Sequence, residues 1–197
     1  MTVAKNANHP QKGSTIRVEP IRDKKAIYRI KKILEDHPRD YCLFVVGINT
    51  AFRANELLSI KAKQVMHLNP GDHLDVKQSK TGKYRRVTLN KTAHDAIAQL
   101  LASRDFAPDD YIYSGKRGLL QVSTVSTMVK QWCQDAGLRG NYASHTLRKT
   151  WGYWQRIERG TSVPLLMEAF GHATQRQTLD YLGIQSEEIS EIYGMEL

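Results

Sequence analysis

Four short polar clusters in this chain carry residue types that could together act on a phosphate ester. The last cluster places Tyr181 nine residues after His172. The three upstream clusters combine arginine, lysine or histidine with small polar residues, and they are Thr50–Leu58, Ser79–Lys83 and Ser144–Arg148. Arginine suits a phosphate because its guanidinium is always protonated and offers a planar fork of donors. A tyrosine hydroxyl can serve as a nucleophile, so the clusters together suit transesterification of a phosphodiester.

Two arginines are the candidates for stabilising the charge on the phosphate. Arg53 follows a polar turn at the start of an expected helix, and Arg148 lies one helical turn after His145. Residues three apart share a helix face, and a helix N-terminus favours a bound anion. A single arginine is usually a surface or ion-paired side chain. The combination of these residues with the later tyrosine is what favours catalysis.

In this order, the clusters resemble the catalytic domain of the tyrosine recombinases, the phage integrase family. The resemblance runs from about residue 20 to residue 193 and contains four motifs in order. It implies that Tyr181 is the nucleophile and forms a 3′-phosphotyrosyl bond with DNA. It assigns the other catalytic roles to Arg53, Lys80, His145, Arg148 and His172, and it gives Glu56 a supporting role in orienting its neighbours. Two positions depart from the usual motifs, Ala51 where glycine is frequent and Lys149 where histidine is frequent, and neither removes a catalytic group.

The choice of catalytic lysine rests on the expected hairpin around Gly82. A lysine near two arginines has a lowered pKa and is a plausible proton donor to the leaving 5′ oxygen. The family places its lysine on such a hairpin, and we assign this role to Lys80, although Lys77 and Lys83 are close. The candidate DNA contacts are Lys77, Lys83, Arg85, Arg86 and Lys149.

Positive charge is concentrated in two parts of the chain. The 197 residues carry a formal net charge of +9; residues 1–32 hold nine lysines and arginines against two acids, and residues 77–91 hold six against none. This pattern predicts a polyanionic partner, double-stranded DNA before a membrane. The longest apolar run, Tyr41–Ile48, is far too short to span a bilayer. We expect a cytoplasmic protein that is associated with the nucleoid when bound to DNA.

We expect the chemistry to need neither a metal nor a cofactor. No cluster has the spacing of metal ligands, and the two cysteines, Cys42 and Cys133, fall within apolar helical patterns typical of a reduced core.

Hydrophobic periodicity predicts an α+β fold that is mostly helical, with one small antiparallel sheet. Expected helices cover Asp23–His37, Tyr41–Ile48, Arg53–Ile60, a segment capped by Asn90, a segment capped by Ser123, His145–Glu158 (capped by Ser144), Val163–Phe170, a segment capped by Thr174 that carries Tyr181, and Ser186–Tyr193. Expected strands cover Leu74–Gln78, Tyr84–Leu89 and Tyr111–Tyr113. We divide the chain into a flexible basic arm (1–20), the catalytic domain (21–183) and a C-terminal helix or tail (184–197). The tail either docks on a neighbouring protomer or folds back on its own domain.

The resemblance implies a site-specific recombinase of a mobile DNA element that acts as a homotetramer on DNA and is a monomer in solution. Strand exchange would pass through a Holliday junction, and the need for an accessory DNA-bending protein stays open. The alternatives are a type IB topoisomerase-like activity and a DNA-binding or regulatory protein that keeps the fold without catalysis. Topoisomerase relatives place lysine at the position of His145, which favours recombination. The chain is similar to short members that contain the catalytic domain alone, and a part of a longer integrase fits equally well.

Overall fold

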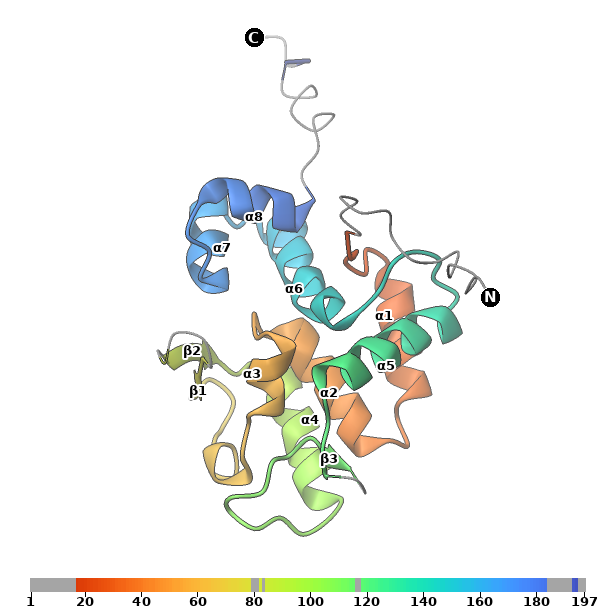
Figure 1. Ribbon diagram of the computed structural model, residues 1–197, viewed down its shortest axis with the longest axis vertical. Coiled ribbons are helices and arrows are strands. Elements are labelled where there is room, and N and C mark those ends of the chain that lie inside the picture. Colours follow the sequence, from red (N-terminus) through yellow and green to blue (C-terminus); the bar gives the residue numbers. More distant parts are fainter. Residues whose placement is uncertain (1–16, 79–81, 83, 116–117, 184–192, 195–197) are drawn as a thin grey trace, which may run out of the picture.

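A computed structural model describes residues 17–78, 82, 84–115, 118–183 and 193–194 (Figure 1). The elements found there are α1 (Lys24–Ile33), α2 (Pro38–Asn49), α3 (Ala54–Leu58), a 3-10 turn (Ala62–Gln64), β1 (His73–Lys77), β2 (Tyr84–Thr88), α4 (Lys91–Ala102), β3 (Ser114–Gly115), β4 (Gly118–Leu119), α5 (Val122–Asp135), α6 (Ser144–Arg159), α7 (Val163–Phe170) and α8 (Gln175–Leu182). The predicted mostly helical class is confirmed. The strands form two antiparallel pairs, β1–β2 and β3–β4, where the sequence predicted a single sheet.

Helix α2 lies at the centre of the main core. Its residues from Cys42 to Gly47 are all buried, and it packs against α4 and α6. The sequence pattern predicted that the first helix continues to His37 and stops at Pro38, but α1 ends at Ile33 and Pro38 opens α2 instead. Proline suits the first turn of a helix because its missing N–H would have no partner there.

The close approach of α2 and α6 depends on Gly47. A Cβ atom at this position would lie 2.6 Å from Cδ1 of Leu147, which is closer than carbon atoms pack. Helix α6 begins with residues 144–148, the cluster that contains His145 and Arg148. The absent side chain at Gly47 therefore helps to set the position of these two candidate residues.

Sequence signals located the starts of two helices correctly. Asn90 and Thr174 cap α4 and α8, because each side chain accepts a hydrogen bond from a backbone N–H of the first turn. Ser123 is not a cap, since α5 already begins one residue earlier, and Ser144 is the first residue of α6 and not its cap. At Tyr111–Tyr113 the structure has an isolated bridge between Tyr111 and Lys61 in place of a strand.

The β1–β2 hairpin shows the alternation of a sheet with one buried face. Leu74 and Val76 of β1 are buried in the main core, whereas Asp75 between them pairs with Arg86 of β2. The register places Val76 opposite Arg85. Arg85 therefore belongs to the buried face of the hairpin, and its side chain is only 7% exposed.

A second, smaller core lies where α6, α7 and α8 meet. Ala51, Leu166, Phe170 and Leu182 form it, with Trp151 and Tyr181 packed against it. Figure 1 shows α7 and α8 as a pair at one end of α6, on the side of the molecule away from α4. This core packs the helix that carries Tyr181 against α6 and α7.

Part of the predicted arm and most of the predicted tail lie outside the described residues. Of the arm, residues 17–20 are described, and the backbone N–H of Glu19 donates to the carbonyl of Asn141 at 2.8 Å. The helix predicted at Ser186–Tyr193 falls almost entirely on residues that are not described. Among the helices of the described ranges, none is long and apolar enough to cross a membrane.

Candidate active site

Arg148 is a fully buried cation at the base of the site. Its side chain is 2% exposed, and its guanidinium donates to the backbone carbonyls of Ala51 and Phe170. Burial lowers the pKa of Arg148 to about 10, and the neighbouring Arg53 and Arg85 act in the same direction. The group is still protonated at neutral pH, so the fold maintains a positive charge in a position shielded from water.

Glu56 is a buried carboxylate shared by three arginines. It accepts hydrogen bonds from the backbone N–H of Arg53 at 2.7 Å and from the guanidinium of the same residue at 3.1 Å. Nε of Arg85 lies 3.4 Å from one carboxylate oxygen, and Nη1 of Arg148 lies 3.9 Å from the other. One negative charge faces three positive charges, so the cluster has a net positive charge that suits an additional anion.

Tyr181 lies beside this cluster on α8. Its hydroxyl is 3.3 Å from Nδ1 of His145, and its ring makes edge contacts with Phe170 and His172 at centroid distances of 5.1 and 5.0 Å. Nζ of Lys149 lies 4.8 Å from the centre of the ring. Burial raises the pKa of Tyr181 to about 12, although the nearby Arg148 opposes this shift. The phenol is therefore protonated at neutral pH and needs a base to become an effective nucleophile.

His172 occupies the corner between α7 and α8. Gly171 ends α7 with a φ of +59°, a left-handed conformation that favours glycine. The imidazole then stacks on Phe170 with a centroid distance of 5.0 Å, and its Nδ1 lies 3.0 Å from the hydroxyl of Thr178. Burial lowers the pKa of His172 to about 4, and the positive charges of Arg148, Arg53 and Arg85 add to the effect.

His145, in the first turn of α6, has a pKa that is lowered for the same reasons as that of His172. Burial lowers its pKa below the usual value, with Arg148, Arg53 and Lys149 contributing in that order. Both candidate histidines are thus neutral at pH 7, and a neutral imidazole can accept a proton.

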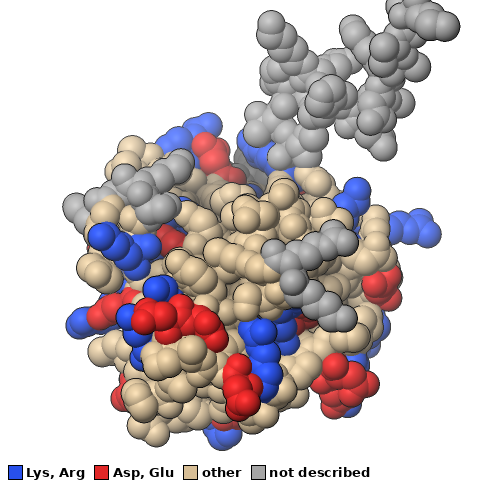
Figure 2. Space-filling view, turned by 60° about the horizontal axis from the view of Figure 1, so that its bottom comes forward, with Lys and Arg blue, Asp and Glu red and all other residues tan. Residues whose placement is uncertain are grey.

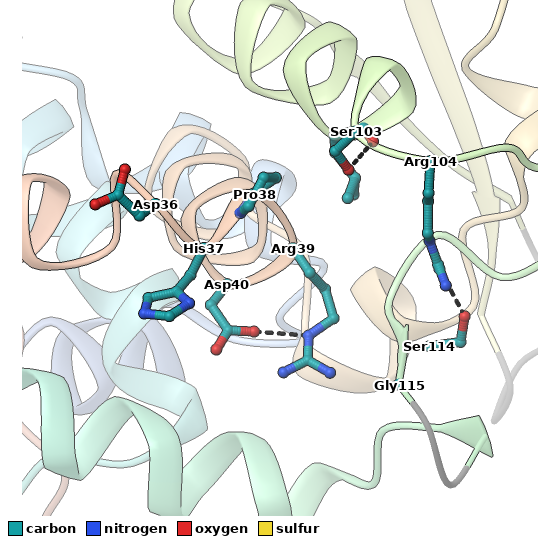
Figure 3. Close-up of a pocket in the computed structure, with 10 residues that line it drawn as sticks. Asp36, His37, Pro38, Arg39, Asp40, Ser103, Arg104, Ser114 and Gly115 are labelled. Atoms are coloured by element: carbon teal, nitrogen blue, oxygen red, sulfur yellow. Dashed lines mark hydrogen bonds and ion pairs between the residues drawn. The ribbon is translucent and has the colours of Figure 1, made fainter.

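Two cavities border this group of side chains, and His145 lines both of them. A cavity of about 590 Å³ is lined by Arg53, Asn55, Glu56, Gln78, Ser144, His145, Gly171 and Gln177, among others. A second cavity of about 480 Å³ adjoins Tyr181 and is lined by Arg17, His145 and Lys149, among others. Another cavity, of about 440 Å³, lies at the N-terminus of α2 and contains none of the predicted catalytic residues (Figure 3). Three of its charged side chains already have partners, since Arg39 pairs with Asp40 and Arg104 donates to Ser114.

The structure brings together six residues that the sequence singled out. They are Arg53, Glu56, His145, Arg148, His172 and Tyr181. Lys80 and Lys83 lie outside the described residues, so the structure gives no position for either. Within the described ranges, no group of three or more His, Cys, Asp or Glu side chains could hold a metal ion.

The candidate DNA contacts differ in their environments. Lys77 is exposed, and Arg86 is exposed but paired with Asp75 at 2.7 Å. Arg85 does not fit the prediction of a DNA-facing side chain, because it is buried and its guanidinium donates to carbonyl oxygens inside the protein. On the face shown in Figure 2, basic and acidic side chains are intermixed among uncharged ones, without a continuous basic surface.

Sequence reasoning missed Phe170, which contacts most of the site. Its ring contacts His172 and Tyr181, the guanidinium carbon of Arg148 lies 4.9 Å from the ring centre, and its carbonyl accepts hydrogen bonds from Arg85 and Arg148. A phenylalanine at the end of an apolar helix usually belongs to a core. The sequence signal that could have found it is its position directly before Gly171 and His172.

The amino-acid sequence of this chain matches a known protein family. Residues 21–188 match the model of the phage integrase family, and the chain belongs to that family. It is 28% identical over 179 residues to the probable integrase/recombinase YoeC of Bacillus subtilis (strain 168), an alignment that covers 89% of this chain and 95% of YoeC.

Two solved structures show the same fold. The crystal structure of XerA recombinase matches with a TM-score of 0.73 and 21% identity, over 92% of this chain and 65% of that chain. A lambda integrase tetramer bound to a Holliday junction matches with a TM-score of 0.65 and 18% identity, over 92% of this chain and 52% of that chain. This chain therefore spans nearly all of YoeC, but about half to two thirds of these two recombinase chains.

Proposed function

We propose that this protein is a tyrosine-type site-specific DNA recombinase that cleaves and rejoins DNA without a metal ion. The observation that carries the proposal is the position of the Tyr181 hydroxyl, 3.3 Å from the imidazole of His145 and beside a cluster of three arginines around one carboxylate. Membership of the phage integrase family supports the same chemistry.

In the first step, the Tyr181 oxygen attacks the scissile phosphorus. The bond from phosphorus to the 5′ oxygen breaks as the 3′-phosphotyrosyl bond forms, so one phosphodiester replaces another. The phenol proton passes to His145, whose neutral form can accept it. The leaving 5′ oxygen takes a proton from Lys80, the proposed general acid.

Arg53, Arg148 and His172 stabilise the phosphorane as its charge increases. Arginine donors fixed by the fold need no rearrangement when that charge develops, which is the main benefit of a preorganised site. Glu56 holds Arg53 at the edge of the cavity through two hydrogen bonds, so we assign it a positioning role.

Rejoining reverses the step with a 5′ hydroxyl from a second DNA site. Exchange of two strands in succession would pass through a Holliday junction, the substrate named in the tetrameric lambda integrase structure. We propose a homotetramer on double-stranded DNA.

The test is the formation of a protein–DNA adduct that is stable in SDS. The protein is incubated, with EDTA present, with supercoiled plasmid DNA that carries the flanks of its own gene. Tyr181→Phe is the control variant, and Tyr193→Phe is a matched tyrosine outside the site. The proposal predicts an adduct with the wild type and with Tyr193→Phe, and none with Tyr181→Phe. An adduct that survives in Tyr181→Phe would remove the assigned nucleophile, and tight DNA binding without any adduct would favour a non-catalytic DNA-binding protein.

A further inference from the structure

Arg85 makes an unusual set of contacts for a residue on a two-stranded hairpin. Its side chain is 7% exposed, and its three nitrogen donors all have acceptors within the protein. Nε faces Glu56 at 3.4 Å, Nη2 donates to the carbonyl of Phe170 at 3.0 Å, and Nη1 donates to the carbonyl of Ala169. The neighbouring Arg86 faces outward and pairs with Asp75.

The two carbonyls belong to the last turn of α7. Carbonyls at a helix C-terminus lack partners within the helix and carry the negative end of its dipole, so they attract cations. The carbonyl of Phe170 accepts from Arg148 as well as from Arg85. Gly171 follows directly, and a Cβ atom there would lie 2.9 Å from Nη2 of Arg85. The guanidinium is thus packed against the corner that leads to His172.

Arg85 connects two parts of the molecule that have separate cores. The hairpin is held by the main core through Leu74 and Val76, whereas α7 and α8 are held by the second core through Phe170 and Leu182. The site needs residues from both parts, because Glu56 lies on α3, which packs in the main core, while His172 and Tyr181 belong to the corner and α8.

We propose that Arg85 is a positioning residue that joins the β1–β2 hairpin to the α7–α8 corner and so holds His172 against the arginine cluster. Its effect on DNA cleavage rests on the proposed function, but the connection between hairpin and corner does not. Glu56 accepts hydrogen bonds from both the Arg85 and the Arg53 guanidinium, so Arg85 also acts indirectly on the position of Arg53. This role differs from a DNA contact, because all three nitrogen donors of Arg85 already have acceptors inside the protein.

The test compares Arg85→Gln and Arg85→Lys with Arg104→Gln, a matched change of an exposed arginine that donates to Ser114 beside the cavity without predicted catalytic residues. The first measurement is an NMR titration of the His172 imidazole in the protein without DNA. Burial lowers the pKa of His172 most, and the charges of Arg148, Arg53 and Arg85 add to this effect. Arg85→Gln should raise this pKa, whereas Arg85→Lys and Arg104→Gln should leave it near the wild-type value.

The second measurement is single-turnover cleavage at saturating protein on the DNA that forms the adduct, together with DNA affinity at several salt concentrations. Misplacement of a catalytic group by about 1 Å can slow a reaction on the order of 100-fold. Arg85→Gln should show a loss of that size with unchanged affinity and salt dependence, Arg85→Lys a smaller loss, and Arg104→Gln none.

The outcomes separate the two proposals. If Arg85→Gln matches Arg104→Gln in both measurements, Arg85 has no positioning role. If cleavage falls only in proportion to affinity, with a shallower salt dependence, Arg85 is a DNA contact and the positioning role is contradicted. If the wild type forms no adduct, the proposed function fails, and a shift of the His172 titration in Arg85→Gln alone still shows that Arg85 lies against the corner in solution. Should Arg85→Gln not fold, Arg85→Lys must still slow cleavage relative to Arg104→Gln.

Discussion

Glu56 shows how one carboxylate can organise several cations. Three guanidiniums surround it, and its side chain is 2% exposed. Removing one partner of a buried ionic cluster leaves the others uncompensated, which typically costs about 3 kcal/mol or more. We expect Glu56→Gln to lower the free energy of unfolding by about 3 kcal/mol in urea denaturation.

The matched control is Asp75→Asn, which breaks an exposed pair with Arg86. Exposed pairs contribute little, so its cost should stay below about 1 kcal/mol. Equal effects of the two substitutions would contradict the central position assigned to Glu56.

The lowered pKa of His172 predicts how the free energy of unfolding depends on pH. Its pKa is about 4 in the folded protein, below the usual value of 6.5, so the unfolded chain binds more protons between these values. The contribution of His172 is fully present above pH 6.5 and is lost as the pH falls toward 4. We expect the free energy of unfolding to fall over this window, and to fall less steeply in His172→Gln. Equal slopes in the wild type and His172→Gln would contradict the buried environment assigned to His172.

Residue types and spacing were enough to predict most of the candidate site but not its support. A histidine three residues before an arginine, or a tyrosine nine residues after a histidine, can be read from the sequence. The partner of Arg85 cannot, because it is a backbone carbonyl 85 residues away and any residue type has one. Phe170 was missed for a similar reason. It contacts the site through a backbone carbonyl, which every residue has, and through an apolar ring, which is typical of any core residue.

At the level of helices, the contact between α2 and α6 controls where His145 and Arg148 lie. A methyl group at Gly47 must displace Leu147, and overpacking of this kind costs about 1–3 kcal/mol. We expect Gly47→Ala to lower the unfolding midpoint and to slow adduct formation. Leu147→Ala in the same chain should restore part of both losses because it opens the space. A double variant no better than Gly47→Ala would show that this contact does not set the helix position.

Helices and the hairpin could be predicted because their buried faces recur at regular intervals. The ends were harder, since several residue types can begin a helix. Pro38 illustrates this difficulty, because a proline can follow the end of one helix or occupy the first turn of the next. In the structure α1 ends at Ile33 and Pro38 is the first residue of α2. The bridge at Tyr111 depends on pairing with Lys61, which no local pattern indicates.

At the scale of the whole molecule, charge predicts how DNA affinity should respond to salt. The chain carries a net charge of +9, and nine of its basic residues lie in residues 1–32. Counterion release makes such binding fall steeply with ionic strength. Two of these nine, Lys5 and Lys12, lie in residues 1–16, so we expect deletion of residues 1–16 to weaken binding and to lower the slope of log affinity against log salt, measured by fluorescence anisotropy, by up to about 2. Deletion of residues 186–197, which contain acids and no basic residue, should leave the salt dependence unchanged. An unchanged salt dependence after the first deletion would exclude the arm as a major DNA contact.

The most direct test of the central claim is the chemical identity of the covalent bond to DNA. The adduct is trimmed with nuclease, digested with trypsin and analysed by mass spectrometry. Trypsin leaves residues 177–197 as one peptide with two tyrosines, so fragmentation must distinguish Tyr181 from Tyr193. We predict a nucleotide joined through its 3′ phosphate to Tyr181, and a 5′ hydroxyl on the released DNA end that accepts label from a polynucleotide kinase. A nucleotide on Tyr193, or a 5′ phosphate on the free end, would contradict the proposed mechanism.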